Sequence, residues 1–245
     1  MDKPRYLELL RLDGEALARA ATKDLQARVP SCPEWDMAAL VVHTGQVHRH
    51  KAAIVRAGER EYPKDLEIEP GPDDANDLID WYLDGLEALV QILSKTDADA
   101  AVWSWGTDQH VAFWIRRMAQ ETAVHRWDAE ATVADPQPID SELAVDGVEE
   151  MLGEFVRGEA IPYEGIPGDL SLQCTDAGAG WTVHLKPGAV PTYNARTGPG
   201  AATVRGPASD VLLLLWRRVG LDDVRVTGKT DLARDFWNYM EGPGQ

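Results

Sequence analysis

The sequence contains little that would indicate a secreted or membrane-spanning protein. Its only cysteines, Cys32 and Cys174, do not form a Cys-x-x-Cys pair, so we expect no disulfide framework. No apolar run approaches the roughly 18 residues of a membrane span, and the first residues lead into an amphipathic helix pattern instead of an apolar signal core. We therefore expect a cytoplasmic protein with no membrane partner.

Basic residues are also scarce. The 24 lysines and arginines are outnumbered by 41 aspartates and glutamates, which gives a formal charge of −17. Nucleic-acid binders need clustered Lys and Arg to displace counterions, so this balance argues against a nucleic-acid partner. Small-molecule chemistry fits the composition better, and 44% apolar residues are enough for a packed core.

Four helices are predicted in the first part of the chain, joined by polar, Pro-rich or Gly-rich stretches. They run from about 6 to 28, 36 to 57, 74 to 95 and 113 to 128, and Asp36 is the expected N-cap of the second. Four helices of about twenty residues with alternating short and medium connections suggest an antiparallel four-helix bundle over residues 1–136.

The pattern changes after about residue 136. A helical stretch at 140–158 precedes short β-like runs, among them a hairpin with its loop at 175–180, and two further helices. We therefore predict a small α+β domain over 137–245, which makes the whole chain α+β. The expected strands are 169–174, 181–186, 201–205 and 224–227, and the expected helices are 209–218 and 230–240.

The most informative residues are Glu121 and His125. They stand four residues apart in a segment without proline or glycine, so they share one face of a helix, and Asp128 lies one turn further on. A carboxylate on the buried face of a helix must be neutralised, paired or bound to a metal. One helical turn between Glu and His lets both reach a single ion.

A metal site needs a third ligand, and His43 is the best candidate because it lies on the apolar stripe of the second helix. His50 lies two turns further, about 10 Å along the axis, so it cannot share an ion with His43. His48 is expected to point away from the stripe. Spacing alone leaves a second interpretation open, in which His43 is a satisfied core histidine and Glu121 pairs with an arginine.

Several phrases resemble one known family. They are Val-Pro-Ser-Cys-Pro-Glu-Trp-Asp at 29–36, Leu-Val-Val-His-Thr-Gly at 40–45, the run from Arg116 to Glu130, and Val-Arg-Gly-Pro-Ala-Ser-Asp at 204–210. They are similar to the mycothiol-dependent maleylpyruvate isomerase family, which belongs to the DinB-like metal-binding four-helix bundles and carries a small α+β C-terminal domain. The resemblance covers nearly the whole chain.

The resemblance places the family's metal ligands on His43, Glu121 and His125. It implies a divalent metal, usually zinc, and mycothiol as thiol cosubstrate. A thiol bound to such a cation loses its proton and becomes a competent nucleophile. The implied reaction is addition to a small-molecule electrophile, ending in isomerisation if the thiol is eliminated or in S-transfer if the adduct is retained.

Two further residues are candidates for catalysis. Asp128 could orient a ligand imidazole or touch substrate, although it could also be a solvated residue at the helix end. Arg218, with Arg217 next, matches an arginine that the family's isomerase uses, although both could simply cap a helix. No arginine counterpart is found between Glu61 and Asp80, so a less anionic electrophile is at least as plausible as maleylpyruvate.

Two other functions remain open from the sequence. A metal hydrolase would use bound hydroxide, with Asp128 as general base. A non-catalytic binding or sensor protein would use the ion only for stability. Cys32, which precedes a helix N-terminus, could be reactive, but Cys-Pro before a helix is also a common structural turn.

Overall fold

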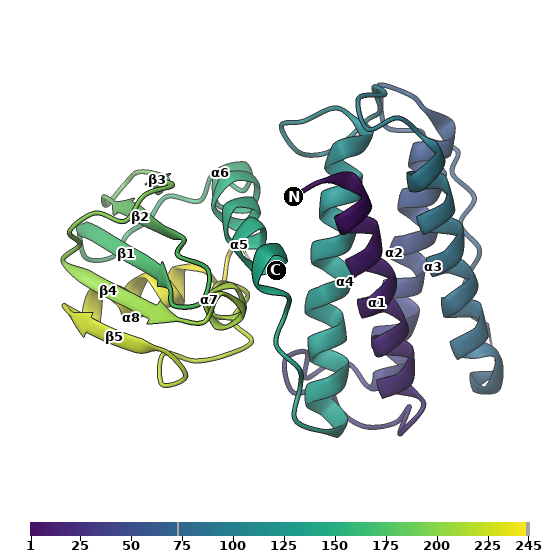
Figure 1. Ribbon diagram of the computed structural model, residues 1–245, viewed down its shortest axis with the longest axis horizontal. Helices are drawn as coiled ribbons and strands as arrows, with labels where there is room; N and C mark the ends of the chain where they lie inside the picture. Colours follow the sequence, from purple (N-terminus) through teal and green to yellow (C-terminus); the bar gives the residue numbers. More distant parts are fainter. Residues whose placement is uncertain (73, 244–245) are drawn as a thin grey trace. The chain divides into compact units, whose positions relative to one another are not determined.

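The computed structural model describes residues 1–72 and 74–243 (Figure 1). The chain divides into two compact units, Met1–Gln137 and Pro138–Gln245. Buried apolar side chains occur in both units, so each has its own core. Among the described residues, no helix combines the length and apolar character that crossing a bilayer requires.

The first unit is a four-helix bundle, as predicted. Its helices are α1 (Lys3–Ala21), α2 (Met37–Ala57), α3 (Leu78–Lys95), which follows a short 3₁₀ turn at Ala75–Asp77, and α4 (Val111–Val133). Helix α2 contacts both α3 and α4, and α1 also contacts both. The pairs α1/α3 and α2/α4 run antiparallel, because the long connection between α2 and α3 returns along the bundle (Figure 1).

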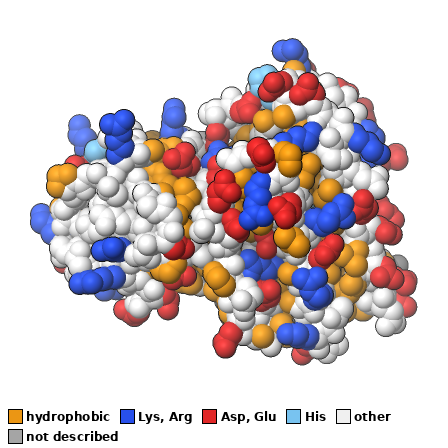
Figure 2. Space-filling view, in the orientation of Figure 1, with side chains coloured by type: hydrophobic (Ala, Val, Ile, Leu, Met, Phe, Trp, Pro, Cys, Tyr) orange, Lys and Arg blue, Asp and Glu red, His pale blue; other side chains and the backbone are white. Residues whose placement is uncertain are grey.

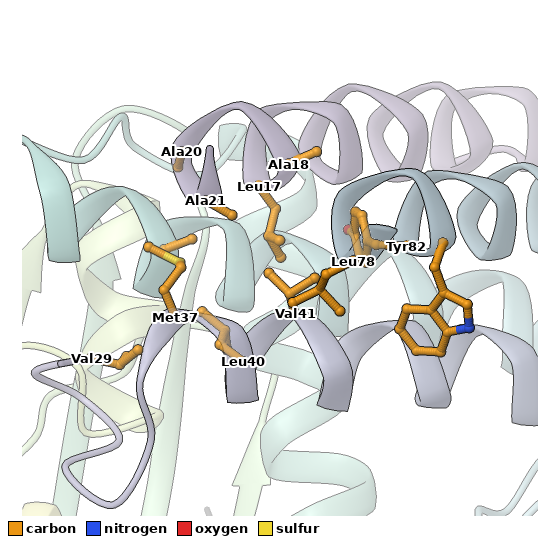
Figure 3. Close-up of a cluster of buried hydrophobic side chains, with 12 residues drawn as sticks. Leu17, Ala18, Ala20, Ala21, Val29, Met37, Leu40, Val41, Leu78 and Tyr82 are labelled. Carbon is orange, nitrogen blue, oxygen red and sulfur yellow. The ribbon is translucent and has the colours of Figure 1, made fainter. Parts of the chain in front are cut away.

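One core cluster of the bundle gathers buried side chains from all four helices (Figure 3). Asp36 caps α2 as predicted, and its carboxylate accepts a hydrogen bond of 2.8 Å from the Ala39 N–H. This cap fixes where α2 begins and therefore which of its residues face α4. The buried side chains include Leu17 and Ala21 from α1, Met37, Leu40 and Val41 from α2, and Leu78 and Tyr82 from α3.

The prediction that the first helix continues to residue 28 is wrong, since α1 ends at Ala21. The residues after it pair with the start of α2 instead. The Met37 N–H donates to the Ala27 carbonyl and the Ala38 N–H to the Leu25 carbonyl, both at 2.9 Å. Those carbonyls satisfy the first amides of α2, which have no partner within their own helix.

The second unit is an α+β fold, as predicted. Its five-stranded sheet has the order β3-β2-β1-β4-β5, with β1 and β4 parallel and the other pairs antiparallel. Helices α7 and α8 pack on the sheet and α5 packs on α7. The elements are α5 (Ser141–Glu150), a π-helical turn (Met151–Phe155), α6 (Val156–Gly158), β1 (Gly168–Cys174), β2 (Gly180–Leu185), β3 (Thr192–Asn194), β4 (Ala202–Gly206), α7 (Ala208–Leu215), β5 (Arg225–Gly228) and α8 (Thr230–Tyr239).

Helix α7 is shorter than the predicted 209–218, so Arg217 and Arg218 lie beyond its end. The backbone of Arg217 is left-handed (φ 61°), and the Arg218 N–H donates to the Leu213 carbonyl at 2.8 Å. Both arginines therefore lie past the helix in a closing turn. The Arg217 guanidinium stacks 3.7 Å from the Trp237 ring centroid, which ties this turn to α8.

Acidic and basic side chains are interspersed over the face of the bundle formed by α1 and α4 (Figure 2). Ion pairs accompany this pattern. Arg5 contacts Glu8 at 2.7 Å, and Arg126 contacts both Asp13 at 3.0 Å and Glu130 at 2.8 Å. Arg126 is itself buried, so these two acids compensate a charge that would be costly alone.

Candidate functional site

His43 of α2 and Glu121 and His125 of α4 meet at the interface of these two antiparallel helices. Oε1 of Glu121 lies 3.4 Å from Nε2 of His43 and 3.3 Å from Nε2 of His125. One ligand atom from each residue lies within 4.8 Å of the others. The structure therefore brings together three of the residues that the sequence singled out, each with a donor atom facing the same point.

Hydrogen bonds from outside the cluster fix the orientation of its two α4 members. Nδ1 of His125 lies 3.0 Å from Oδ2 of Asp128, and the Ser31 hydroxyl donates to Oδ1 of Asp128 at 2.6 Å. The second oxygen of Glu121 accepts a bond of 2.9 Å from Arg117. These contacts leave Nε2 of His125 and Oε1 of Glu121 turned toward the cluster.

Asp128 is fully buried, so it is not a solvated residue at the end of the helix. One of its oxygens faces His125 and the other accepts from Ser31. A carboxylate in this position orients the imidazole and makes its other nitrogen a stronger metal ligand, as is common for metal-binding histidines. Asp128 thus acts on the cluster through His125.

The electrostatics of the cluster favour a charged carboxylate. Burial opposes ionisation of Glu121, but hydrogen bonds from His125 and His43 and the nearby Arg117 charge hold its pKa well below the usual range. Burial also opposes protonation of His125, but Asp128 and Glu121 outweigh it and raise the pKa of His125 to about 9. At neutral pH the cluster therefore pairs a Glu121 carboxylate with a protonated His125, and a metal ion that binds there would have to displace that proton.

This donor set fits a divalent metal ion. Two imidazole nitrogens and one carboxylate oxygen are the ligands of many catalytic zinc sites, which keep a further position open. The Trp35 ring lies 4.7 Å from the His43 ring and 6.2 Å from the His125 ring, between centroids, so it covers one side of both. The His43 side chain is 37% exposed, which leaves the cluster accessible from solvent.

The other histidines of α2 lie outside the cluster. His50 is near Tyr62, with Nε2 3.3 Å from the tyrosine oxygen. The spacing turns His48 away from the apolar stripe of α2, yet His48 is fully buried, and its Nε2 lies 2.9 Å from the Thr122 hydroxyl oxygen. The reason is that α2 is covered by both α3 and α4, so its buried face is wider than one apolar stripe.

The remaining sequence candidates have structural contacts of their own. Cys32 packs against the core cluster of the bundle, and its N–H closes a turn on the Val29 carbonyl at 3.1 Å. Arg218 belongs to the second unit, where its guanidinium donates to the Trp216 carbonyl at 3.0 Å. The catalytic role expected for Arg218 stays a prediction.

Sequence reasoning missed the residues that support the ligands. Arg117 stands four residues before Glu121, a spacing that would have indicated contact on the helix surface. Ser31 and Trp35 come from the loop before α2, and no local pattern links them to α4. Only the tertiary fold brings Ser31 to Asp128, which is 97 residues away.

The architecture defines a class of protein, a four-helix bundle with a His-Glu-His cluster followed by a separate α+β unit. Family models agree with it over most of the chain. Residues 8–130 match the mycothiol maleylpyruvate isomerase N-terminal domain, and residues 142–234 match the C-terminal domain of the same family. The chain therefore belongs to the mycothiol maleylpyruvate isomerase family, an enzyme family.

Solved structures show the same fold. The crystal structures of the mycothiol-dependent maleylpyruvate isomerase and of a mutant of it each superpose with a TM-score of 0.62 at 14% sequence identity, covering 94% of both chains. No curated protein matches the chain. At this identity the likeness establishes the fold, and the reaction must be argued from the residues of this chain.

Proposed function

We propose that the chain is a metal-dependent enzyme that uses mycothiol to attack a small-molecule electrophile. The observation that carries the proposal is the convergence of His43, Glu121 and His125 at a solvent-accessible point in a member of this family. In the proposal these three side chains hold one divalent ion, with zinc as the expected metal.

A divalent cation at this point would supply one chemical effect, which is to hold a bound thiol in its thiolate form. The chain's own residues prepare the site for it. Arg117 holds the second oxygen of Glu121 at 2.9 Å, and Asp128 holds Nδ1 of His125 at 3.0 Å, so both donors keep their direction. Trp35 shields one side of the imidazoles and the exposed side of His43 leaves room for the reactants.

The proposed reaction begins when the thiolate sulfur adds to an activated double bond of the electrophile. A C–S bond forms and the electron pair of the double bond moves to the conjugated carbonyl oxygen as an enolate. In isomerisation, rotation about the new single bond is followed by elimination, which breaks the C–S bond and regenerates the thiolate. In S-transfer, the enolate carbon accepts a proton equivalent to the one that the thiol released, and the adduct is retained.

The geometry favours this reaction over hydrolysis with Asp128 as general base. Both oxygens of that carboxylate are already engaged, one with Ser31 and the other with His125, and the residue is fully buried. A general base must reach the proton that it removes, directly or through one water. Whether turnover requires a thiol therefore distinguishes the proposed reaction from hydrolysis.

The test is product analysis by mass spectrometry and NMR after incubation of zinc-loaded protein with mycothiol and maleylpyruvate. We expect an isomerised product or a thiol adduct with the wild type, neither with His43→Ala, and retained activity with the matched control His50→Ala. Turnover without thiol would contradict the proposal in favour of a hydrolase. A stable metal site without any turnover across a panel of electrophiles would favour a binding protein.

A further inference from the structure

His48 makes a polar contact inside the helical bundle. Its side chain is fully buried, and its Nε2 lies 2.9 Å from the Thr122 hydroxyl oxygen on α4. Among the described residues, this is the one side-chain hydrogen bond between α2 and α4 apart from the contact of His43 with Glu121. The two contacts are neighbours, because Thr122 directly follows Glu121 and His48 lies about 7.5 Å beyond His43 along the helix axis.

The imidazole of His48 is held in place and uncharged. The Tyr82 ring on α3 lies 5.5 Å from the His48 ring, between centroids. Burial lowers the pKa of His48 to about 3, so the ring is neutral at physiological pH. In the part of the chain that the structure describes, Nδ1 of this ring has no hydrogen-bond partner. The tautomer with the lower desolvation cost therefore carries its proton on Nε2 and donates it to Thr122.

A buried polar pair of this kind adds little to the stability of a helical bundle. Taking both groups out of water offsets most of what their hydrogen bond contributes, and replacing both by apolar groups of similar shape is nearly neutral or stabilising. Such pairs instead fix the register of neighbouring helices, because any other register leaves a buried donor or acceptor unpaired. The contact between His48 and Thr122 has the properties of such a register device.

We propose that the contact of His48 with Thr122 fixes the axial register of α2 against α4. This register brings His43 of α2 within reach of Glu121 and His125 of α4. His48 is thus a positioning residue, which acts on the cluster through the two helices. The inference rests on the proposed function, in which the cluster holds a divalent ion. Nε2 of His43 lies 3.4 Å from Oε1 of Glu121, whereas a slip of one helical turn would move it by about 5.4 Å.

The test measures two properties of the full chain in the wild type and in the double variant His48→Leu/Thr122→Val. One is zinc affinity, from competition with a chromophoric chelator in the absence of any thiol. The other is the nuclear Overhauser effect between the imidazole protons of His43 and His125 in metal-free protein, where the ring centroids lie 5.2 Å apart. We expect the double variant to bind zinc about tenfold more weakly or worse, as when other supports of metal ligands are removed, and to lose most of the Overhauser effect.

Thermal unfolding separates this role from a merely structural one. The double variant should unfold at or above the wild-type temperature, because it removes both polar groups together. Thr122→Val alone should unfold at a lower temperature, because it leaves the His48 N–H buried without a partner, and Thr122→Ser should keep both zinc affinity and the Overhauser effect. The matched control is Leu17→Ala, which removes a buried side chain of α1 and should lower the unfolding temperature without changing zinc affinity.

The inference is wrong if the wild type shows no such Overhauser effect or if the double variant retains it at full strength. It is also wrong if the double variant binds zinc as tightly as the wild type, or if Leu17→Ala loses as much zinc affinity as the double variant. A wild type that binds no zinc would refute the proposed function instead. The Overhauser effect, which is measured without metal, would then decide the inference alone.

Discussion

Asp128→Ala is expected to weaken metal binding without removing a ligand. In the structure Asp128 lies 3.0 Å from Nδ1 of His125 and is fully buried, so its removal leaves that nitrogen without its carboxylate partner. Losing such a partner typically lowers metal affinity about 10- to 100-fold. That range corresponds to about 1.4–2.7 kcal/mol of binding free energy.

The assay is a competition titration of zinc between the protein and a chromophoric chelator at constant pH. Ser31→Ala should produce a smaller loss, because it removes the 2.6 Å hydrogen bond to Asp128 but keeps the carboxylate. Asp135→Ala is the matched control, since it removes an exposed aspartate that lies beyond the end of α4. Wild-type zinc affinity in Asp128→Ala would refute the argument that this carboxylate positions His125.

Three further predictions concern the stability and reactivity of the chain. Burial lowers the pKa of His48 to about 3, so its imidazole stays neutral in the folded protein, whereas in the unfolded chain it binds a proton below about pH 6.5. Its contribution should therefore make the free energy of unfolding about 2 kcal/mol smaller at pH 5 than at pH 8. Urea denaturation at both pH values should show that His48→Gln loses less stability on acidification than the wild type. An equal loss would contradict the role given to His48. Burial and Asp176 raise the pKa of Cys174 to about 11, so peptide mass spectrometry after brief iodoacetamide treatment at pH 8 should find Cys32 labelled first, and faster labelling of Cys174 would count against it. A methyl group at Gly45 would meet the Trp81 ring, so Gly45→Ala should lose about 1–3 kcal/mol in thermal unfolding, whereas Gly158→Ala, which meets nothing within 4 Å, should show no such loss.

The α4 helix shows how much a local sequence pattern can predict. A run without proline or glycine, with Glu121 and His125 one turn apart, was enough to predict the helix and the shared face of both side chains. The apolar stripe of the second helix made His43 the best third candidate, the resemblance supported it, and the structure brings all three side chains together. Periodicity could not supply that last step, because the contact between α2 and α4 depends on tertiary packing.

The features that the sequence does not predict depend on contacts between residues that are far apart along the chain. The end of α1 was predicted too late because backbone pairing with the start of α2 replaces a helical turn after Ala21. The position of His48 away from the apolar stripe does not indicate its burial, because α2 packs against both α3 and α4. Ser31 has no signal in the sequence, since its partner Asp128 lies 97 residues away along the chain.

The most direct test of the account is the metal content of the protein. Protein purified without chelator and measured by inductively coupled plasma mass spectrometry should contain about one divalent ion per chain, held by three protein ligands. His43→Ala should lose that ion while keeping its helical circular dichroism, and His50→Ala should retain it. Full metal occupancy in His43→Ala would contradict the assignment of His43, Glu121 and His125 as the metal ligands.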